Sequence, residues 1–236
     1  MLPDLAPAVE RLRAAHGQLD GKALLEAVLT GDLAGRVAVT SSFGAESAVL
    51  LDLVAQVDPA TPVIFLDTRE LFDETVDYRL TLERHLGLTN VIVVQPEADD
   101  LAEAEDLWRL DVDRCCELRK VRPLARATRG FDALVDGRKR AHGFERERLA
   151  TIEDGGGVIK ISPLANWSGA DIEAHFVARG LPRHPLVAQN YRSIGCWPCT
   201  RPVAPGESPR SGRWAGRAKS ECGIHTLDLG RDGAGI

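Results

Sequence analysis

The sequence has no apolar run that approaches the roughly 20 residues needed to cross a bilayer. We therefore expect a soluble, cytoplasmic protein that does not engage a membrane. No N-terminal stretch combines the basic residues, apolar core and small-residue cleavage site that together mark an export signal. Disulfide bonds are not expected, because they form mainly in oxidising compartments.

The common nucleotide-loop motifs are also missing. Residues 41–47 (SSFGAES) lack the Lys of a Walker A sequence and the spacing of GxGxxG. They do place small hydroxylated residues and a glycine between an expected strand and an expected helix, where exposed N–H groups favour an anion. The segment is either an anion-binding loop, with Ser41, Ser42 and Gly44 as candidate contacts, or an ordinary helix N-terminus.

Cysteines are few, five in 236 residues, and they lie in three short clusters. Two clusters are doublets, the adjacent Cys115 and Cys116 and the pair Cys196 and Cys199 in CWPC, and the third is Cys222 alone. Four thiolates in two doublets can enclose a metal ion or an iron–sulfur cluster. The fifth thiol then remains free to act as a nucleophile.

Two simpler interpretations of the doublets must be weighed. Inert buried cysteines are common, but they seldom occur in doublets flanked by Arg, Lys and Pro. A structural zinc site with four cysteine ligands is the stronger alternative. Zinc doublets usually space their cysteines by two to four residues, whereas neighbours on a helix diverge by about 100°. The adjacent pair therefore favours a cluster with separate irons over one tetrahedral ion.

The net charge is −6, but basic residues are concentrated beside the cysteines. Residues 114–148 contain eleven Lys or Arg against five acids, and residues 201–219 contain five against one. We infer an anionic substrate that meets the thiols there. A nucleic-acid surface is the alternative that composition leaves open, although no nucleic-acid partner is expected.

Short apolar runs alternate with helical patterns over much of the chain. Strands separated by helices indicate an α/β protein with a doubly wound, mostly parallel sheet, which binds ligands at the carboxyl ends of its strands. We expect strands at residues 36–40, 62–66, 91–94 and 133–135, and helices within residues 5–30, 48–57 and 72–86.

Three regions follow from this pattern. We expect an N-terminal helical segment (1–35), a nucleotide-binding α/β domain (36–181) and a C-terminal segment (182–236). Pro, Gly, Ser and Arg dominate the last region and its periodicity fades. We expect this irregular segment to wrap over the domain or to move.

Seven motifs, in this order along the chain, resemble those of the assimilatory adenylyl-sulfate (APS) reductases. They are SSFGAES, LDTRELFDET (66–75), DRCCELRKVRPL (113–124), IKISPLANW (159–167), IGCWPCTRPV (194–203), PRSGRW (209–214) and KSECGIH (219–225). The resemblance implies an adenine nucleotide alpha-hydrolase-like fold in which SSFGAES is a modified pyrophosphatase loop. Relatives that use 3′-phosphoadenylyl sulfate (PAPS) typically lack both cysteine doublets. The doublets therefore favour APS, with PAPS or dual specificity as the alternative.

The resemblance also implies a role for individual residues. Cys115, Cys116, Cys196 and Cys199 resemble the ligands of a [4Fe-4S] cluster, and Cys222 resembles the catalytic nucleophile. The implied substrate-binding residues are Lys120, Arg146, Arg210 and Arg213 for the phosphosulfate, and Leu66, Thr68 and Gly137 for the adenosine. Each basic residue has solvated surface charge as its alternative.

Two departures from the family pattern stand out. The family usually reads LDTG, whereas Arg69 follows Thr68 here, which leaves the geometry of that turn open. The segment KRAHGFER (139–146) differs from the usual RRxQSxxR or RRxExPTR. A small gap there decides whether Arg146 or Arg148 matches the family's arginine.

The implied enzyme is an oxidoreductase of sulfate assimilation, and hence of cysteine biosynthesis. The Cys222 thiolate would attack the sulfur of APS, expel AMP and leave a cysteine S-sulfonate. Thioredoxin, or glutaredoxin, would then release sulfite, and the cluster need not be redox-active because thiols supply both electrons. Neighbouring basic residues would favour the Cys222 thiolate while Glu221 opposes it. His225 would be either a base or an exposed residue, and we expect a homo-oligomer.

Two other functions are compatible with parts of the sequence. A tRNA-thiolating enzyme also combines a pyrophosphatase-type loop with a CxxC, but its loop usually reads SGGxDS, and Phe43 and Ala45 interrupt that pattern. A non-enzymatic four-cysteine metal module would not require a nucleotide domain of about 150 residues.

Overall fold

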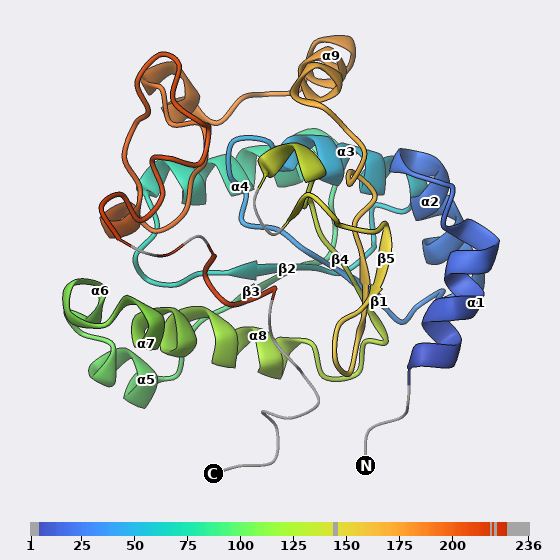
Figure 1. The fold of residues 1–236 in the computed structure, drawn as a ribbon, viewed down its shortest axis with the longest axis horizontal. Coiled ribbons are helices and arrows are strands. Elements are labelled where there is room, and N and C mark those ends of the chain that lie inside the picture. Colours follow the sequence, from blue (N-terminus) through green and yellow to red (C-terminus); the bar gives the residue numbers. More distant parts are fainter. Residues whose placement is uncertain (1–4, 144–145, 218, 220, 226–236) are drawn as a thin grey trace.

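A computed structural model describes residues 5–143, 146–217, 219 and 221–225, which form a six-stranded sheet with helices on both faces (Figure 1). The strands are β1 (Val37–Thr40), β2 (Val63–Leu66), β3 (Val91–Val94), β4 (Ala133–Val135), β5 (Ile152–Asp154) and β6 (Ile159–Ile161). Their order in the sheet is β3-β2-β1-β4-β6-β5, and only the β5–β6 pair is antiparallel. The mostly parallel, doubly wound sheet predicted from the sequence is confirmed.

Alternate residues of the central strand face two different cores. Val37 and Val39 belong to the larger buried cluster, and Ala38 belongs to the smaller one on the opposite face. The larger core is covered by helices α1 (Ala6–His16), α2 (Gly21–Ala27), α3 (Ser47–Val57), α4 (Asp73–Leu86) and α9 (Gly169–Arg179). Helix α8 (Arg122–Ala127) contributes Leu124 to the smaller core. Both faces are therefore apolar, as burial on both sides of a parallel sheet requires.

The helices expected within residues 5–30 are present as α1 and α2, with a π-helical turn at Val28–Asp32. Val9, Leu12, Leu24 and Leu25 on these helices are buried in the same core as the strands. The N-terminal segment thus packs directly onto the α/β unit.

Several elements lie outside the sequence predictions. They are β5, β6, α9, α5 (Ala98–Glu103), α6 (Leu107–Leu110), α7 (Val112–Cys116), a π-helical turn at Glu117–Val121, and α8. Most are too short for periodicity to separate a strand from a helix. Helix α9 did carry a readable signal, a capping box in which Ser168 and Asp171 exchange hydrogen bonds.

The C-terminal segment is irregular in the residues described, as predicted. From residue 182 onward it contains two short 3₁₀ turns, Pro185–Gln189 and Trp197–Cys199, and an isolated bridge between Thr200 and Arg213. In Figure 1 this orange-to-red segment lies at the end of the sheet toward which the arrow of β2 points. Within the described ranges, no helix is long and apolar enough to traverse a membrane.

Candidate active site

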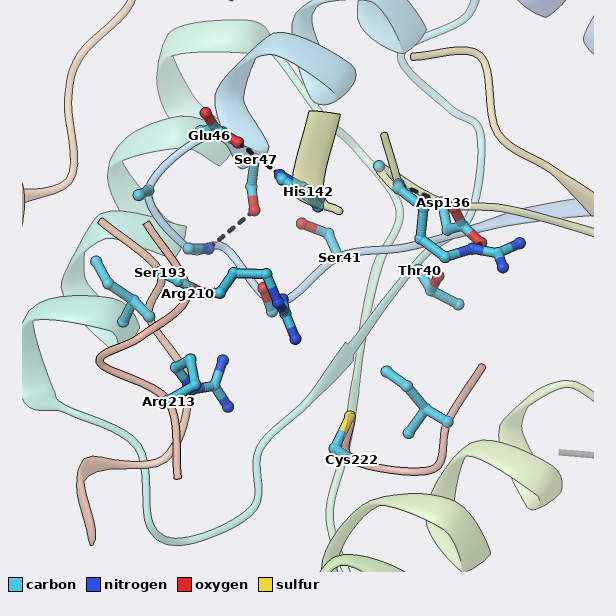
Figure 2. A pocket seen from close by; sticks show the side chains of 18 of the residues that line it. Thr40, Ser41, Glu46, Ser47, Asp136, His142, Ser193, Arg210, Arg213 and Cys222 are labelled. Carbon is cyan, nitrogen blue, oxygen red and sulfur yellow. Dashed lines mark hydrogen bonds and ion pairs between the residues drawn. The ribbon is translucent and has the colours of Figure 1, made fainter. Parts of the chain in front are cut away.

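A cavity of about 320 Å³ lies at the carboxyl ends of the parallel strands (Figure 2). Residues that follow β1, β2 and β4 line it, which is where an open α/β sheet binds ligands. The C-terminal segment closes it from the other side. Every substrate-binding residue proposed from the sequence, together with Cys222, lines this cavity: Ser41, Ser42, Gly44, Leu66, Thr68, Lys120, Gly137, Arg146, Arg210 and Arg213.

The serine-rich loop after β1 is folded by its own side chains. Ser41 Oγ accepts a hydrogen bond from the Phe43 N–H at 3.2 Å, and Ser47 Oγ accepts one from the Gly44 N–H at 2.8 Å. Phe43 has a positive φ of 46°, and its ring packs edge-on against Phe65 in the core. The buried ring anchors a backbone conformation that is costly for a residue with a side chain.

The turn after β2 resolves one departure from the family pattern. Arg69 has φ 61°, the left-handed conformation that a glycine adopts without strain. Its N–H is bonded to Asp67 Oδ1 at 3.0 Å. The backbone therefore makes a glycine-type turn although the residue is arginine, and Thr68 just before it still lines the cavity.

Three cavity residues that sequence reasoning missed form a polar cluster behind the loop. Glu46 is paired with Lys139, and Glu46 Oε2 lies 3.3 Å from His142 Nε2. Burial opposes the charge on Glu46, but the His142 hydrogen bond and the Lys139 charge outweigh it and lower its pKa to about 2. The only hint in the sequence was the unusual segment around His142.

Arg146 is held between His142 and Glu221. Arg146 Nη1 lies 3.0 Å from His142 Nδ1, and Arg146 Nε donates to Glu221 Oε1 at 2.7 Å. Arg210 Nη2 lies 3.4 Å from the same oxygen of Glu221. Arg148 is exposed and does not line the cavity, so the geometry favours Arg146 as the arginine of this site.

Arg213 forms an isolated β-bridge with Thr200, and its side chain lines the cavity. Its guanidinium carbon lies 4.4 Å from the centre of the Trp214 ring, and its buried Nε has no hydrogen-bond partner among the described residues. Figure 2 shows Arg210 and Arg213 side by side, directed into the same space as Cys222. Two guanidinium groups next to a thiol make this part of the cavity suitable for an anion.

Cys222 is a free, partly buried thiol on this positively charged side of the cavity. Lys120 and Arg210 both lie close enough to interact electrostatically with the Cys222 sulfur. The flanking chain is tethered, since Ile224 packs on the smaller core and Lys160 Nζ donates to the His225 carbonyl at 2.6 Å. The other four cysteines line a second, smaller cavity, and Cys196 lines both.

The four other cysteines line one small cavity of about 10 Å³. Cys115 and Cys116 end helix α7, which agrees with the helical interpretation of the adjacent pair. Cys196 precedes the 3₁₀ turn Trp197–Cys199, and Cys199 ends it. All four are free thiols. Cys196 Sγ lies 3.2 Å from Thr68 Oγ1, and the Thr68 carbonyl accepts a hydrogen bond from buried Arg119 at 2.9 Å. Side chains of this kind orient the ligands of metal centres.

The four thiols must lose their protons before they can hold a metal ion or an iron–sulfur cluster. Burial raises the pKa of Cys116 to about 11 and also raises the pKa values of Cys115 and Cys199. Such thiols ionise when a metal takes the place of the proton. Within the described part of the chain, no three His, Cys, Asp or Glu side chains are grouped to hold one ion. Lys120 and Arg119 line the same small cavity, and their positive charges would offset the negative charge of thiolates there.

Lys120 connects the two cavities, because it lines both. It lies in the π-helical turn that follows the adjacent cysteines, and its side chain is buried. Burial opposes its charge, but the sulfur atoms of Cys196, Cys222 and Cys116 outweigh that cost and raise the pKa of Lys120. Lys120 is therefore a fixed positive charge between the two groups of cysteines.

His225 is partly buried, with 21% of its side chain exposed. Burial lowers the pKa of its imidazole to about 4, although Asp136, whose Oδ2 lies 3.8 Å from His225 Nδ1, acts in the opposite direction. The ring is neutral at physiological pH. A role of His225 as a base stays a prediction.

Comparison with known proteins agrees with this geometry. A family model described as the phosphoadenosine phosphosulfate reductase domain matches residues 36–202. The adenosine 5′-phosphosulfate reductase of Chelativorans sp. (strain BNC1) is 50% identical over 222 residues, which cover 92% of this chain and 91% of that protein. The protein of the same name from Mesorhizobium japonicum is 46% identical over 221 residues, covering 92% and 87%.

A solved structure shows the same fold. The phosphoadenylyl-sulfate (PAPS) reductase from Candida auris, crystallised as a phosphate complex, superposes with a TM-score of 0.69 at 25% identity, covering 83% of this chain and 97% of that chain. This likeness confirms the fold class that the motifs predicted.

Proposed function

This chain belongs to the phosphoadenosine phosphosulfate reductase family, and from that premise we propose that it is an APS reductase of sulfate assimilation, which reduces APS to sulfite and AMP. The observation that carries the proposal is the position of Cys222. Its thiol lines the same cavity as the serine-rich loop and the arginines Arg146, Arg210 and Arg213. A nucleophile, an anion site and a nucleotide-type loop are thereby brought to one place.

The choice of APS over PAPS rests on two observations. The curated relatives from Chelativorans and Mesorhizobium are named for adenosine 5′-phosphosulfate. The four cysteines of the second cavity are also a feature that PAPS-dependent relatives typically lack. PAPS remains the second candidate substrate, because the Candida auris protein with the same fold is a PAPS reductase.

The first half-reaction needs a thiolate and an electrostatic clamp. The Cys222 thiolate attacks the sulfur of APS, the bond from that sulfur to the bridging oxygen breaks, and AMP leaves with the electron pair. Arg210, Arg213 and Lys120 compensate the negative charge that grows on the departing phosphate. The product on the protein is a Cys222 S-sulfonate.

The second half-reaction needs a reductant with two thiols, for which we propose thioredoxin. One thiolate attacks the Cys222 sulfur and displaces sulfite, forming a mixed disulfide. The second thiol of the reductant then resolves this disulfide and restores the Cys222 thiolate. Both electrons come from the dithiol.

We further propose that Cys115, Cys116, Cys196 and Cys199 hold a [4Fe-4S] cluster. When bound, such a cluster would supply a fixed negative charge and join helix α7 to the CWPC turn. Lys120 lies between these cysteines and the substrate cavity. Its ammonium group would be positioned by the cysteines on one side while it neutralises the substrate anion on the other.

Turnover of APS tests the function directly. Purified protein with thioredoxin, its reductase and NADPH is expected to release one sulfite and one AMP for each APS, with kcat/KM higher for APS than for PAPS. A preference for PAPS would replace the substrate assignment, and the absence of turnover with either would overturn the proposed function.

A further inference from the structure

Glu221, the residue before the proposed nucleophile, occupies the arginine cluster of the cavity. Glu221 Oε1 lies 2.7 Å from Arg146 Nε and 2.6 Å from Arg146 Nη2, and 3.4 Å from Arg210 Nη2. The three side chains are only 17%, 11% and 17% exposed, in the order Glu221, Arg146, Arg210. This carboxylate is therefore an anion already bound where the cavity concentrates its positive charge.

Arg146 contacts His142 as well as Glu221. An arginine only donates hydrogen bonds, so His142 Nδ1, 3.0 Å from Arg146 Nη1, must accept. The His142 proton then lies on Nε2, which faces Glu46 at 3.3 Å. The neutral imidazole thus fixes the direction of the guanidinium, and Arg146 is preset to receive an anion at the position that the Glu221 carboxylate fills.

We propose that Glu221 is an internal anion that holds the place of the phosphosulfate in the substrate-free enzyme and is displaced when substrate binds. The inference rests on the proposed function, because it takes these arginines as the phosphosulfate site. A carboxylate and a phosphate or sulfate offer the same oxygen acceptors to a guanidinium, so both cannot occupy it at once. Since Glu221 is bonded to Cys222, its displacement shifts the nucleophile as the substrate enters, and Glu221 is a positioning residue.

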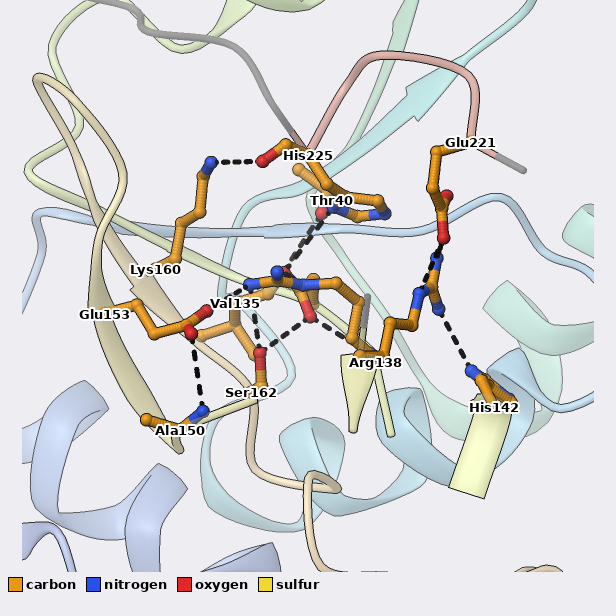
Figure 3. Close-up of polar contacts among 12 residues, drawn as sticks. Thr40, Val135, Arg138, His142, Ala150, Glu153, Lys160, Ser162, Glu221 and His225 are labelled. Atoms are coloured by element: carbon orange, nitrogen blue, oxygen red, sulfur yellow. Dashed lines mark hydrogen bonds and ion pairs between the residues drawn. The ribbon is translucent and has the colours of Figure 1, made fainter. Parts of the chain in front are cut away.

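The rest of the segment can stay in place during this exchange. Lys219 pairs with Asp113, and Lys160 Nζ donates to the His225 carbonyl at 2.6 Å (Figure 3). Neither contact involves Arg146 or Arg210. Substrate can therefore exchange with the carboxylate while these anchors keep Cys222 near the cavity.

AMP is a suitable probe, because it carries a phosphate but no sulfur to transfer. We would titrate AMP calorimetrically into wild type, Glu221→Gln and Glu207→Gln. Glu207 is the matched control, since it pairs with Arg201 in the same C-terminal segment but does not line the cavity. Removal of a competing anion is expected to tighten AMP binding by on the order of tenfold in Glu221→Gln. The Kd of Glu207→Gln for AMP is expected to stay within about twofold of the wild-type value, because an exposed ion pair contributes little.

Two further variants separate competition from loss of structure. Glu221→Asp keeps the charge on a shorter side chain and is expected to bind AMP with intermediate affinity. Asp113→Asn loosens the same segment through Lys219 without touching the arginines, and is expected to bind AMP as wild type does. AMP affinity that is unchanged or weaker in Glu221→Gln, or equally tightened in Asp113→Asn, would overturn the proposal.

The same preparations distinguish this inference from the proposed function. If wild type turns over APS while Glu221→Gln binds AMP no better, only the role of Glu221 is wrong. If wild type releases no sulfite from APS but Glu221→Gln still binds AMP more tightly, the proposed reaction is wrong and the competition by Glu221 stands.

Discussion

The guanidinium of Arg213 packs directly against Gly195, so that no side chain fits at residue 195. A Cβ there would meet Arg213 Nη2 at 2.3 Å and Cζ at 2.6 Å. Gly195 immediately precedes Cys196, and both line the substrate cavity. The backbone that carries a proposed cluster ligand therefore also sets the position of a proposed substrate-binding arginine.

Gly195→Ala is expected to impair catalysis through Arg213. Arg213→Ala alone should cost about 2–4 kcal/mol of transition-state stabilisation, as loss of one electrostatic donor usually does. Because both changes act on one guanidinium, the double variant should be little worse than Arg213→Ala. The kcat/KM values of wild type, the two single variants and the double variant form a double-mutant cycle. Fully additive losses of transition-state stabilisation in the double variant would contradict the coupling.

Replacing any one of Cys115, Cys116, Cys196 or Cys199 by Ser is expected to lose the cluster and most activity, because one iron is left with a poor ligand. Anaerobically purified wild type should contain about four irons and four sulfides per chain. Iron and acid-labile sulfide analysis checks both statements. Zinc in place of iron in such a preparation would overturn the cluster assignment.

Cys222→Ser is the matched control for that series, since it removes a thiol outside the second cavity. It should keep its iron and bind APS, yet form no S-sulfonate, because a hydroxyl is far less ionised than a thiol at neutral pH. In wild type, APS without reductant should add the mass of a sulfonate to the Cys222 peptide and release one AMP per site, and thioredoxin should reverse it. An adduct on Cys196, or activity in Cys222→Ser, would be incompatible with this mechanism.

Arg69→Gly is expected to be tolerated, because residue 69 already has a left-handed backbone at φ 61°. The side chain is 58% exposed and lies 3.6 Å from Asp67, a pair that contributes little to stability. Arg69→Val should lower the free energy of unfolding by about 1–2 kcal/mol, since a β-branched side chain fits this conformation poorly. Urea denaturation measures both, and equal effects of Gly and Val would show that backbone strain is absent here.

The free energy of unfolding is expected to fall as the pH drops from about 6.5 toward 4. Burial lowers the pKa of His184 from 6.5 to about 4, and its ring bonds Thr75 Oγ1 at 3.0 Å. The unfolded chain therefore binds the proton first, so this contribution to stability is complete above pH 6.5 and is lost as the pH falls through the folded pKa. His184→Gln should flatten the pH dependence of the urea midpoint over this range. If the urea midpoint of His184→Gln depended on pH as steeply as that of wild type, groups other than His184 would be responsible for the pH dependence.

Local patterns in the sequence were enough to predict the sheet and the division of the cysteines. Strands such as 62–66 are continuous apolar runs because both faces of a parallel sheet are buried. The spacing within CWPC and within the adjacent Cys115 and Cys116 is a covalent property of the chain, and it separates Cys222 from the other four before any fold is known. Strands β5 (IED) and β6 (IKI) were missed because charged residues interrupt these short runs, whereas β4 (ALV), of the same length, is wholly apolar.

Only the tertiary structure decided which charged groups meet in the cavity. Glu221 binds Arg146 across 75 residues, and His142 meets Glu46 across 96, distances along the chain at which no sequence spacing predicts a contact. The same folding placed Arg146 in the cavity and left Arg148 exposed. Strand and helix formation depend on neighbouring residues, whereas ion pairs of this kind depend on where the sheet brings the ends of separate strands together, and that is decided by the packing of the whole core.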